Sequence, residues 1–164
     1  MEQTLKCPIC GEPYKGYSHT TVDQSACPKC VAKPTILVVD DDKWNQTYVR
    51  NSLKADYTIV TAWDGREGLA AFIGAADDAF ALVLSDWSMP YMRGTDMVRS
   101  IRNLVPEQKV LMMSSEPEAV RSILKGSKIE DIRVLHKSFT QKVLLEIVNQ
   151  TIYGSIYGEK NHGS

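Results

Sequence analysis

The chain has 164 residues, of which 43% are hydrophobic and 24% are charged, and its formal net charge is −1. This length suffices for one good core, and the near-neutral charge excludes a global field that attracts nucleic acid. No apolar run approaches the roughly 20 residues of a membrane span, and the N-terminus lacks the apolar stretch of a signal peptide, so we expect a cytoplasmic protein without a membrane contact.

The first 31 residues contain all four cysteines, as two C-x-x-C pairs: Cys7 with Cys10, and Cys27 with Cys30. This segment has almost no long aliphatic side chains, so it needs a cross-link in place of an ordinary core. Each pair places two thiolates on one tight turn, and two such turns complete a tetrahedral four-sulfur site for Zn²⁺. We therefore predict a small zinc-ribbon-like module at residues 1–31.

Two alternatives remain open for these cysteines. One is a pair of disulfides, which a reducing compartment disfavours, and the other is iron in place of zinc. His19 is a further candidate ligand, although a histidine beside four thiols is more often a bystander. Lys15 is the only lysine between the two cysteine pairs. A single lysine provides too little positive charge to bind the phosphates of a nucleic acid. Protein contact or dimerisation is the expected role of the module.

The residue composition and hydrophobic pattern of the chain change after a short linker at residues 32–34. From 35 to 153, apolar β-branched runs alternate with segments of helical period. Strands are expected at 35–39, 57–61, 81–85, 110–113 and 132–135, and helices at about 42–54, 64–73, 97–104, 116–125 and 143–153. This alternation predicts an α/β fold with a doubly wound, five-stranded parallel sheet. The helical pattern places Ile123 toward the core, and 154–164 is expected to be a flexible tail.

Reactive polar side chains follow four of the five predicted strands. They are Asp40 and Asp41 after the first strand, Asp86 after the third, Ser114 and Ser115 after the fourth, and His136 and Lys137 after the fifth. Ligands of parallel sheets bind at the carboxyl ends of the strands, so these side chains should converge. Clustered carboxylates repel one another unless a cation intervenes, and oxygen ligands suit Mg²⁺. A strand-end Asp beside Mg²⁺ can form an acyl phosphate, whose oxygens Ser114 and Lys137 can contact.

Residues 35–153 resemble a response-regulator receiver domain, the phosphoacceptor module of two-component signalling. The matching stretches are ILVVDDD at 36–42, LVLSDWSMPYMRGTDM at 82–97, VLMMSSE at 110–116 and LHKSF at 135–139. The pattern Asp-x-x-Met-Pro, with a glycine four residues after the proline, is matched by Asp86, Met89, Pro90 and Gly94. The chemotaxis-type receiver is the most similar, because it also carries a tryptophan after the phosphorylated aspartate.

The resemblance implies a flavodoxin-like sheet of strand order 2-1-3-4-5, with Asp86 as the phosphoacceptor. Asp41 would bind Mg²⁺ directly, Asp40 mainly through water, and Ser88 through its backbone carbonyl. Ser114 takes the place of the family's switch Thr or Ser, and Lys137 that of its lysine. A histidine kinase would donate the phosphoryl group, and the chain would catalyse only its own phosphotransfer and dephosphorylation. Output would pass to a downstream protein, from a monomer or weak homodimer, with nucleic acid an improbable partner.

Three positions depart from the family pattern. Ser138 stands where a cis proline usually follows the lysine, so the loop is expected to be trans or strained and Lys137 to be placed differently. Val134 replaces the aromatic switch residue, which predicts altered coupling. Ser115 stands where Ala or Gly is common, and we predict that Ser88, Ser115 and Glu116 tune the lifetime of the phosphoryl group.

Two other functions remain as alternatives. In the first, the cysteine module is a nucleic-acid or protein adaptor and the receiver fold is only its scaffold; retention of the acidic residues, Ser114 and Lys137 argues against this. In the second, the chain is a phosphatase or hydrolase with an Asp nucleophile. Such enzymes usually place a second Asp two residues beyond the first, where this chain has Ser88, and the chain leaves no room for a substrate cap.

Overall fold

The computed structural model describes residues 2–6, 13–17 and 33–154, and the chain divides into two compact units, 1–33 and 34–164. In the first unit, strands β1 (Glu2–Lys6) and β2 (Pro13–Tyr17) pair antiparallel, with Lys6 opposite Pro13. The predicted metal ligands of this unit, the four cysteines, lie outside the described residues, as do His19 and the tail at 155–164.

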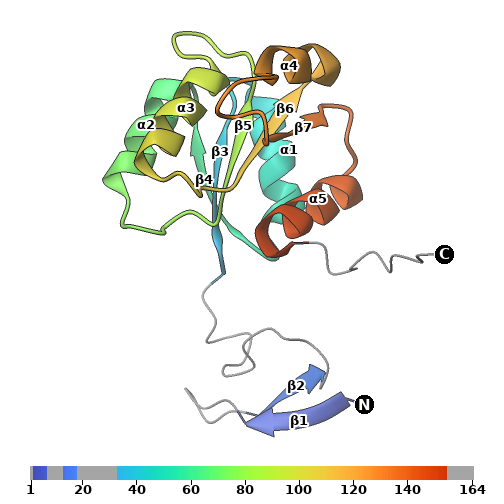
Figure 1. Ribbon diagram of the computed structural model, residues 1–164. Helices are drawn as coiled ribbons and strands as arrows, with labels where there is room; N and C mark the ends of the chain where they lie inside the picture. The colour runs from blue at the N-terminus through green and yellow to red at the C-terminus, as the bar shows by residue number, and fades with distance from the viewer. Residues whose placement is uncertain (1, 7–12, 18–32, 155–164) are drawn as a thin grey trace, which may run out of the picture. The chain divides into compact units, whose positions relative to one another are not determined.

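The second unit is a five-stranded parallel sheet between two layers of helices (Figure 1). Its strands are β3 (Thr35–Val39), β4 (Thr58–Ala62), β5 (Leu82–Asp86), β6 (Val110–Ser114) and β7 (Arg133–His136). They lie in the order β4-β3-β5-β6-β7, which is the predicted order 2-1-3-4-5 within this unit. The alternation of apolar strands and amphipathic helices correctly predicted the parallel sheet of this unit, and the family resemblance correctly predicted its strand order.

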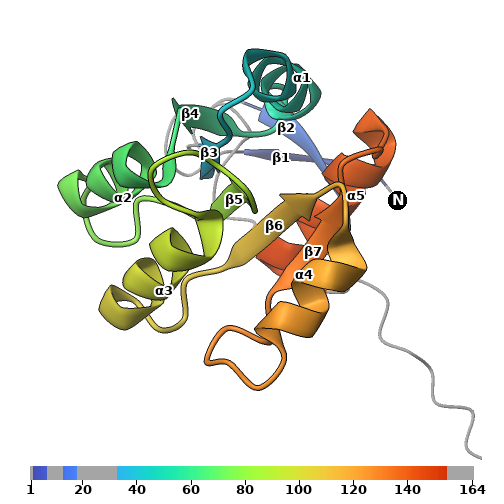
Figure 2. The same cartoon turned by 90° about the horizontal axis from the view of Figure 1, so that it is seen from above.

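Four helices connect successive strands, a fifth follows the last strand, and together they cover both faces of the sheet. They are α1 (Lys43–Leu53), α2 (Gly65–Gly74), α3 (Gly94–Leu104), α4 (Pro117–Leu124) and α5 (Gln141–Tyr153). Helices α1 and α5 pack on one face, and α2, α3 and α4 on the other (Figure 2). None of the helices in the described part of the chain has both the length and the apolar character that a bilayer crossing requires.

The chain reverses its winding direction at β3, which places two aspartates side by side. Strand β3 pairs with β4 on one side and with β5 on the other, and Val39 lies opposite Ser85 in the register of β3 and β5. The next residues, Asp40 and Asp86, therefore leave neighbouring strands at the same level. This is the switch point at which open α/β sheets bind ligands.

The helix pattern was wrong about Ile123. Helix α4 turns Val120 and Leu124 toward the sheet, and each is only 1% exposed, whereas Ile123 is 60% exposed. A short helix on a sheet buries one narrow stripe, so an apolar residue next to that stripe stays outside the core. The exposed position of Ile123 becomes important at the site.

Candidate functional site

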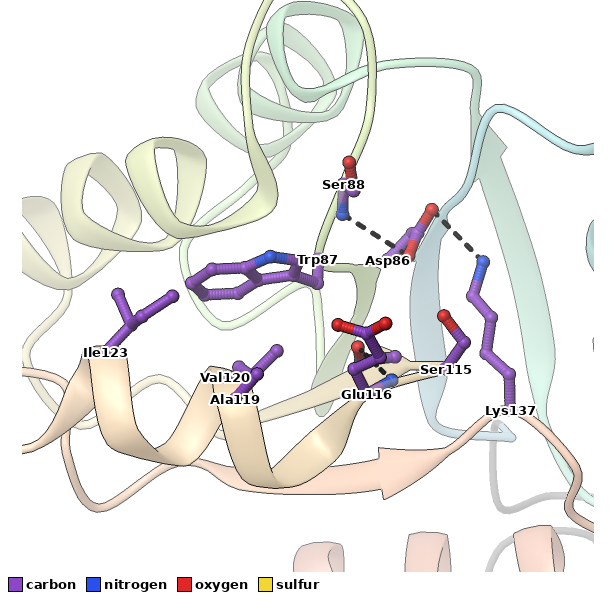
Figure 3. Close-up of a pocket in the computed structure, with 10 residues that line it drawn as sticks. Asp86, Trp87, Ser88, Ser115, Glu116, Ala119, Val120, Ile123 and Lys137 are labelled. Carbon is purple, nitrogen blue, oxygen red and sulfur yellow. Dashed lines mark hydrogen bonds and ion pairs between the residues drawn. The ribbon is translucent and has the colours of Figure 1, made fainter.

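The carboxyl ends of β5, β6 and β7 and the first turns of α4 surround a hollow of about 470 Å³. Its lining consists of Asp86, Trp87, Ser88, Ser114, Ser115, Glu116, Ala119, Val120, Ile123 and Lys137 (Figure 3). Six of these ten residues were predicted as site residues from the sequence. Asp40 and Asp41 lie next to Asp86, so the structure brings all the predicted site residues of this unit to one end of the sheet.

Three carboxylates form the acidic cluster of the site. Asp40, Asp41 and Asp86 each place an oxygen within 4.8 Å of the others. Asp40 is fully buried and Asp86 is 5% exposed, whereas Asp41 faces solvent. One carboxylate oxygen of Asp40 accepts the Asp42 N–H at 2.9 Å, and its buried Oδ2 faces the Lys137 ammonium at 3.3 Å. Three clustered carboxylates carry more negative charge than the one lysine that pairs with Asp40 and Asp86 can balance, and this excess fits a hard divalent cation.

Lys137 neutralises part of this charge. Its Nζ lies 3.1 Å from Asp86 Oδ2 and 3.3 Å from Asp40 Oδ2. Its backbone N–H donates to the Ser114 carbonyl at 2.9 Å, so the end of β7 is fixed against β6. Figure 3 shows the side chain reaching from β7 to Asp86. Lys137 thus points into the site despite the missing proline.

The loop after Lys137 is built without a cis peptide. No peptide bond in the described residues is cis. Instead, the Ser138 N–H donates to His136 Nδ1 at 3.1 Å, and the Ser138 hydroxyl lies 2.6 Å from the same nitrogen. The expectation of a trans loop agrees with the structure, whereas the expected displacement of Lys137 from Asp86 is not seen.

Burial governs the ionisation of the site. Burial raises the pKa of the Asp86 carboxyl to about 6, with the Asp40 charge acting in the same direction and Lys137 opposing it. Burial also raises the pKa of Asp40, against the Asp42 N–H and Lys137. For Lys137, burial acts to lower the pKa, but the two carboxylates outweigh it and the net shift is upward. A bound cation would relieve the cost of keeping these carboxylates charged.

The remaining predicted residues complete the polar end of the hollow. Ser114 is 5% exposed, and its Oγ accepts the Glu116 N–H at 2.9 Å. The Ser88 N–H donates to Asp86 Oδ1 at 3.4 Å, a long hydrogen bond. Ser115 and Glu116 are exposed at the rim. The roles assigned to these side chains and to the Ser88 carbonyl stay predictions.

The sequence analysis missed the apolar end of the hollow. Trp87, Ala119, Val120 and Ile123 line it. The signal was present, because residues 116, 119, 120 and 123 follow the three- and four-residue spacing of one helix face. The apolar residues of this helix face were assigned to the core, so the apolar end of the hollow was not predicted.

Gly94 shows why the loop after Asp86 requires a glycine. A Cβ on Gly94 would lie 2.1 Å from the Asp86 carbonyl oxygen. Its N–H donates to the Trp87 carbonyl at 3.2 Å, which holds the loop against the end of β5. Any side chain at this position would push the loop away from the carboxylate.

Comparison with known proteins identifies this arrangement. The family model for the response regulator receiver domain matches residues 36–149. The chain belongs to this family. The receiver domain is 29% identical over 113 residues to chemotaxis protein CheY-3 of Vibrio cholerae, covering 68% of this chain and 85% of CheY-3. The solved structure of Vibrio cholerae CheY4 superposes with a TM-score of 0.63 at 30% identity, covering 73% of this chain and 99% of CheY4.

Longer proteins contain similar regions. Response regulator protein FleR of Pseudomonas aeruginosa is 30% identical over 131 residues, which are 78% of this chain and 26% of FleR. Sensor histidine kinase TmoS of Ectopseudomonas mendocina is 28% identical over 130 residues, 77% of this chain and 13% of TmoS. The chain thus spans only a small part of these two relatives.

Proposed function

We propose that the receiver domain takes a phosphoryl group onto Asp86 with the help of Mg²⁺ and signals through the resulting conformational change. The observation that carries the proposal is the contact of Asp86 with Lys137 inside an acidic cluster that opens into a hollow. Asp41 would hold the metal directly, Asp40 mainly through water, and Asp86 and the Ser88 carbonyl would complete the protein's ligands. The cation would neutralise charge on the phosphoryl oxygens.

Ser114 and Lys137 have the remaining roles. Lys137 already lies 3.1 Å from an Asp86 oxygen, so it can pair with a phosphoryl oxygen on that carboxylate. The Ser114 hydroxyl holds the Glu116 N–H at the start of α4. If this hydroxyl turns to the phosphoryl group, the N–H loses its acceptor and the start of α4 is released. Ser114 therefore links phosphorylation to α4.

The donor is proposed to be a histidine kinase. The support is the similarity to regions of proteins described as histidine kinases, TmoS among them. The domain would act on no separate substrate and would catalyse only its own phosphorylation and dephosphorylation. A downstream protein would bind the α4–β7–α5 face, where Arg121 Nη2 donates to the Val134 carbonyl at 3.0 Å. A cytoplasmic location and a monomer or weak homodimer stay predictions.

Acetyl phosphate tests the proposal directly. With Mg²⁺, we expect intact-protein mass spectrometry to show a gain of one phosphoryl group, abolished by Asp86→Asn. Asp96→Asn is the matched control, because Asp96 is an exposed aspartate that pairs with Arg99 at 3.3 Å. A folded protein that gains no mass would overturn the proposal and favour the scaffold alternative.

We further propose that residues 1–31 bind one Zn²⁺ through Cys7, Cys10, Cys27 and Cys30. The support is the spacing of the cysteines, together with the pairing of β1 and β2 on either side of the first C-x-x-C in the sequence. Metal analysis of protein purified under reducing conditions should give one zinc per chain. Cys10→Ser should lose most of it, whereas His19→Ala should keep it. Iron, or four cysteines in disulfides, would contradict the assignment.

A further inference from the structure

The hollow beside Asp86 has two chemically different ends. One end is polar and contains Asp86, Ser114 and Lys137. The other end is apolar, and we call it the Trp87 slot, lined by Trp87, Ala119, Val120 and Ile123. The total volume, about 470 Å³, lies in the range of small-molecule pockets and exceeds what one phosphoryl group needs. A phosphoryl group on Asp86 would therefore leave the Trp87 slot unfilled.

Both walls of the slot are held in place. The backbone N–H of Trp87 donates to the Met113 carbonyl at 2.9 Å, and the Trp87 side chain packs against the core. On the opposite wall, Val120 is anchored in the core at 1% exposure. Figure 3 shows the indole above α4, with the side chains of Val120 and Ile123 pointing toward it. Such a slot is formed before any ligand arrives, so little ordering cost opposes binding.

Ile123 is the unusual member of the slot. It is 60% exposed, and it lies at the open end of a hollow that leads to a buried carboxylate. A ligand that reached from Asp86 to Ile123 would cover this apolar surface and gain from its removal from water. The surface thus complements a molecule with a charged group at one end and an apolar group at the other.

The phosphodonor is a molecule of this kind. In an in-line displacement, the leaving group lies on the far side of phosphorus from the attacking oxygen. If Lys137 and Ser114 contact phosphoryl oxygens beside the axis from Asp86 to phosphorus, the far end of that axis opens into the rest of the hollow, which is the space left for the leaving group. We propose that the Trp87 slot binds the leaving group of small acyl phosphate donors and selects aromatic ones; this rests on Asp86 being the phosphoacceptor.

The chemical step is balanced without any further reactant. An Asp86 carboxylate oxygen forms a bond to phosphorus, and the bond from phosphorus to the acyl oxygen breaks. The electron pair of that bond leaves with the acyl group as a free carboxylate, and no proton has to move. Acetyl phosphate and benzoyl phosphate share this bond and this charge and differ mainly in the group that meets the slot.

The rates at which acetyl phosphate and benzoyl phosphate phosphorylate Asp86 therefore test the slot. Both rates are measured by mass spectrometry at equal donor and Mg²⁺ concentrations. We expect the wild-type protein to react about tenfold faster with benzoyl phosphate, the discrimination typical of one apolar group in an apolar pocket. Ile123→Ser should reduce the ratio about threefold, and Trp87→Ala should nearly abolish it. Trp87→Phe should restore it. In each variant the rate with acetyl phosphate reports whether the acceptor site is intact.

Ile73→Ser on α2 is the matched control for Ile123→Ser. Ile73 is 62% exposed, close to the value for Ile123, but it does not line this hollow. Its donor ratio should equal that of the wild type. If acetyl phosphate reacts but the ratio is the same in the wild type, Ile123→Ser and Trp87→Ala, the slot is refuted and the phosphoacceptor stands. If neither donor modifies Asp86, both proposals are overturned.

Discussion

Replacing Lys137 with methionine should slow the phosphorylation of Asp86 by acetyl phosphate about 100-fold, the usual cost of losing one preorganised group that stabilises developing negative charge. Lys137 Nζ is 3.1 Å from Asp86 Oδ2 and needs no rearrangement to meet a phosphoryl oxygen. The measurement is the rate of mass gain at saturating Mg²⁺. Lys142→Met on α5 is the control, since Lys142 is an exposed lysine outside the hollow. An unchanged rate in Lys137→Met would show that the metal alone supplies the positive charge.

The same substitution should lower the free energy of unfolding at pH 7. It leaves Asp40 and Asp86 without their cation, and breaking a buried pair costs about 3–5 kcal/mol. Because the Lys137 side chain is 24% exposed, solvent already screens part of the interaction, and we expect about 2 kcal/mol. Mg²⁺ should recover part of this loss in urea unfolding, because it offers the carboxylates another positive partner. No recovery would argue against a metal in the acidic cluster.

Asp86→Asn should stabilise the metal-free protein at pH 7, although it abolishes phosphorylation. Burial raises the pKa of Asp86 from its ordinary 3.8 to about 6, so the folded chain binds a proton more tightly than the unfolded chain. The free energy of unfolding therefore falls as the pH rises from about 4 to about 6, and above that range the full cost is present. We expect the variant to gain about 3 kcal/mol at pH 7 in urea unfolding with a chelator present, since each unit of the pKa difference corresponds to about 1.4 kcal/mol.

The pH dependence separates this cause from a change in packing. Between pH 5 and 7 the unfolding free energy of Asp86→Asn should vary less than that of the wild type. Some dependence should remain, because burial also raises the pKa of Asp40. Asp96→Asn should keep the wild-type profile, because its ion pair with Arg99 is exposed. A stability gain that is equal at pH 5 and pH 7 would point to packing as the cause.

The fold and the polar end of the site were predictable because they depend on local patterns. Apolar runs such as Leu82 to Leu84 identify buried strands, and the residues that follow them must meet at one edge of a parallel sheet. Asp86 and Lys137 could therefore be placed at one edge without knowledge of any distance. The position of Ile123 could not be predicted, because helical spacing shows which residues share a face but not what covers that face.

Lys137 shows a second limit of local reasoning. Ser138 in place of proline suggested a displaced lysine, since a cis bond at a non-proline residue costs about 3 kcal/mol. The position of Lys137 is instead fixed by its N–H bond to the Ser114 carbonyl, and the loop is closed by His136 and Ser138. These are contacts between strands and within a loop, which the identity of one residue does not reveal.

The sequence by itself determined the chemistry available at the end of each strand: carboxylates, a hydroxyl and an amine. Only the tertiary structure decided what each of them does. Asp40 and Asp41 are neighbours of the same residue type, yet Asp40 is fully buried and pairs with Lys137, and Asp41 faces solvent. The reason is that burial depends on what packs over a position, and here the packing elements come from distant parts of the chain.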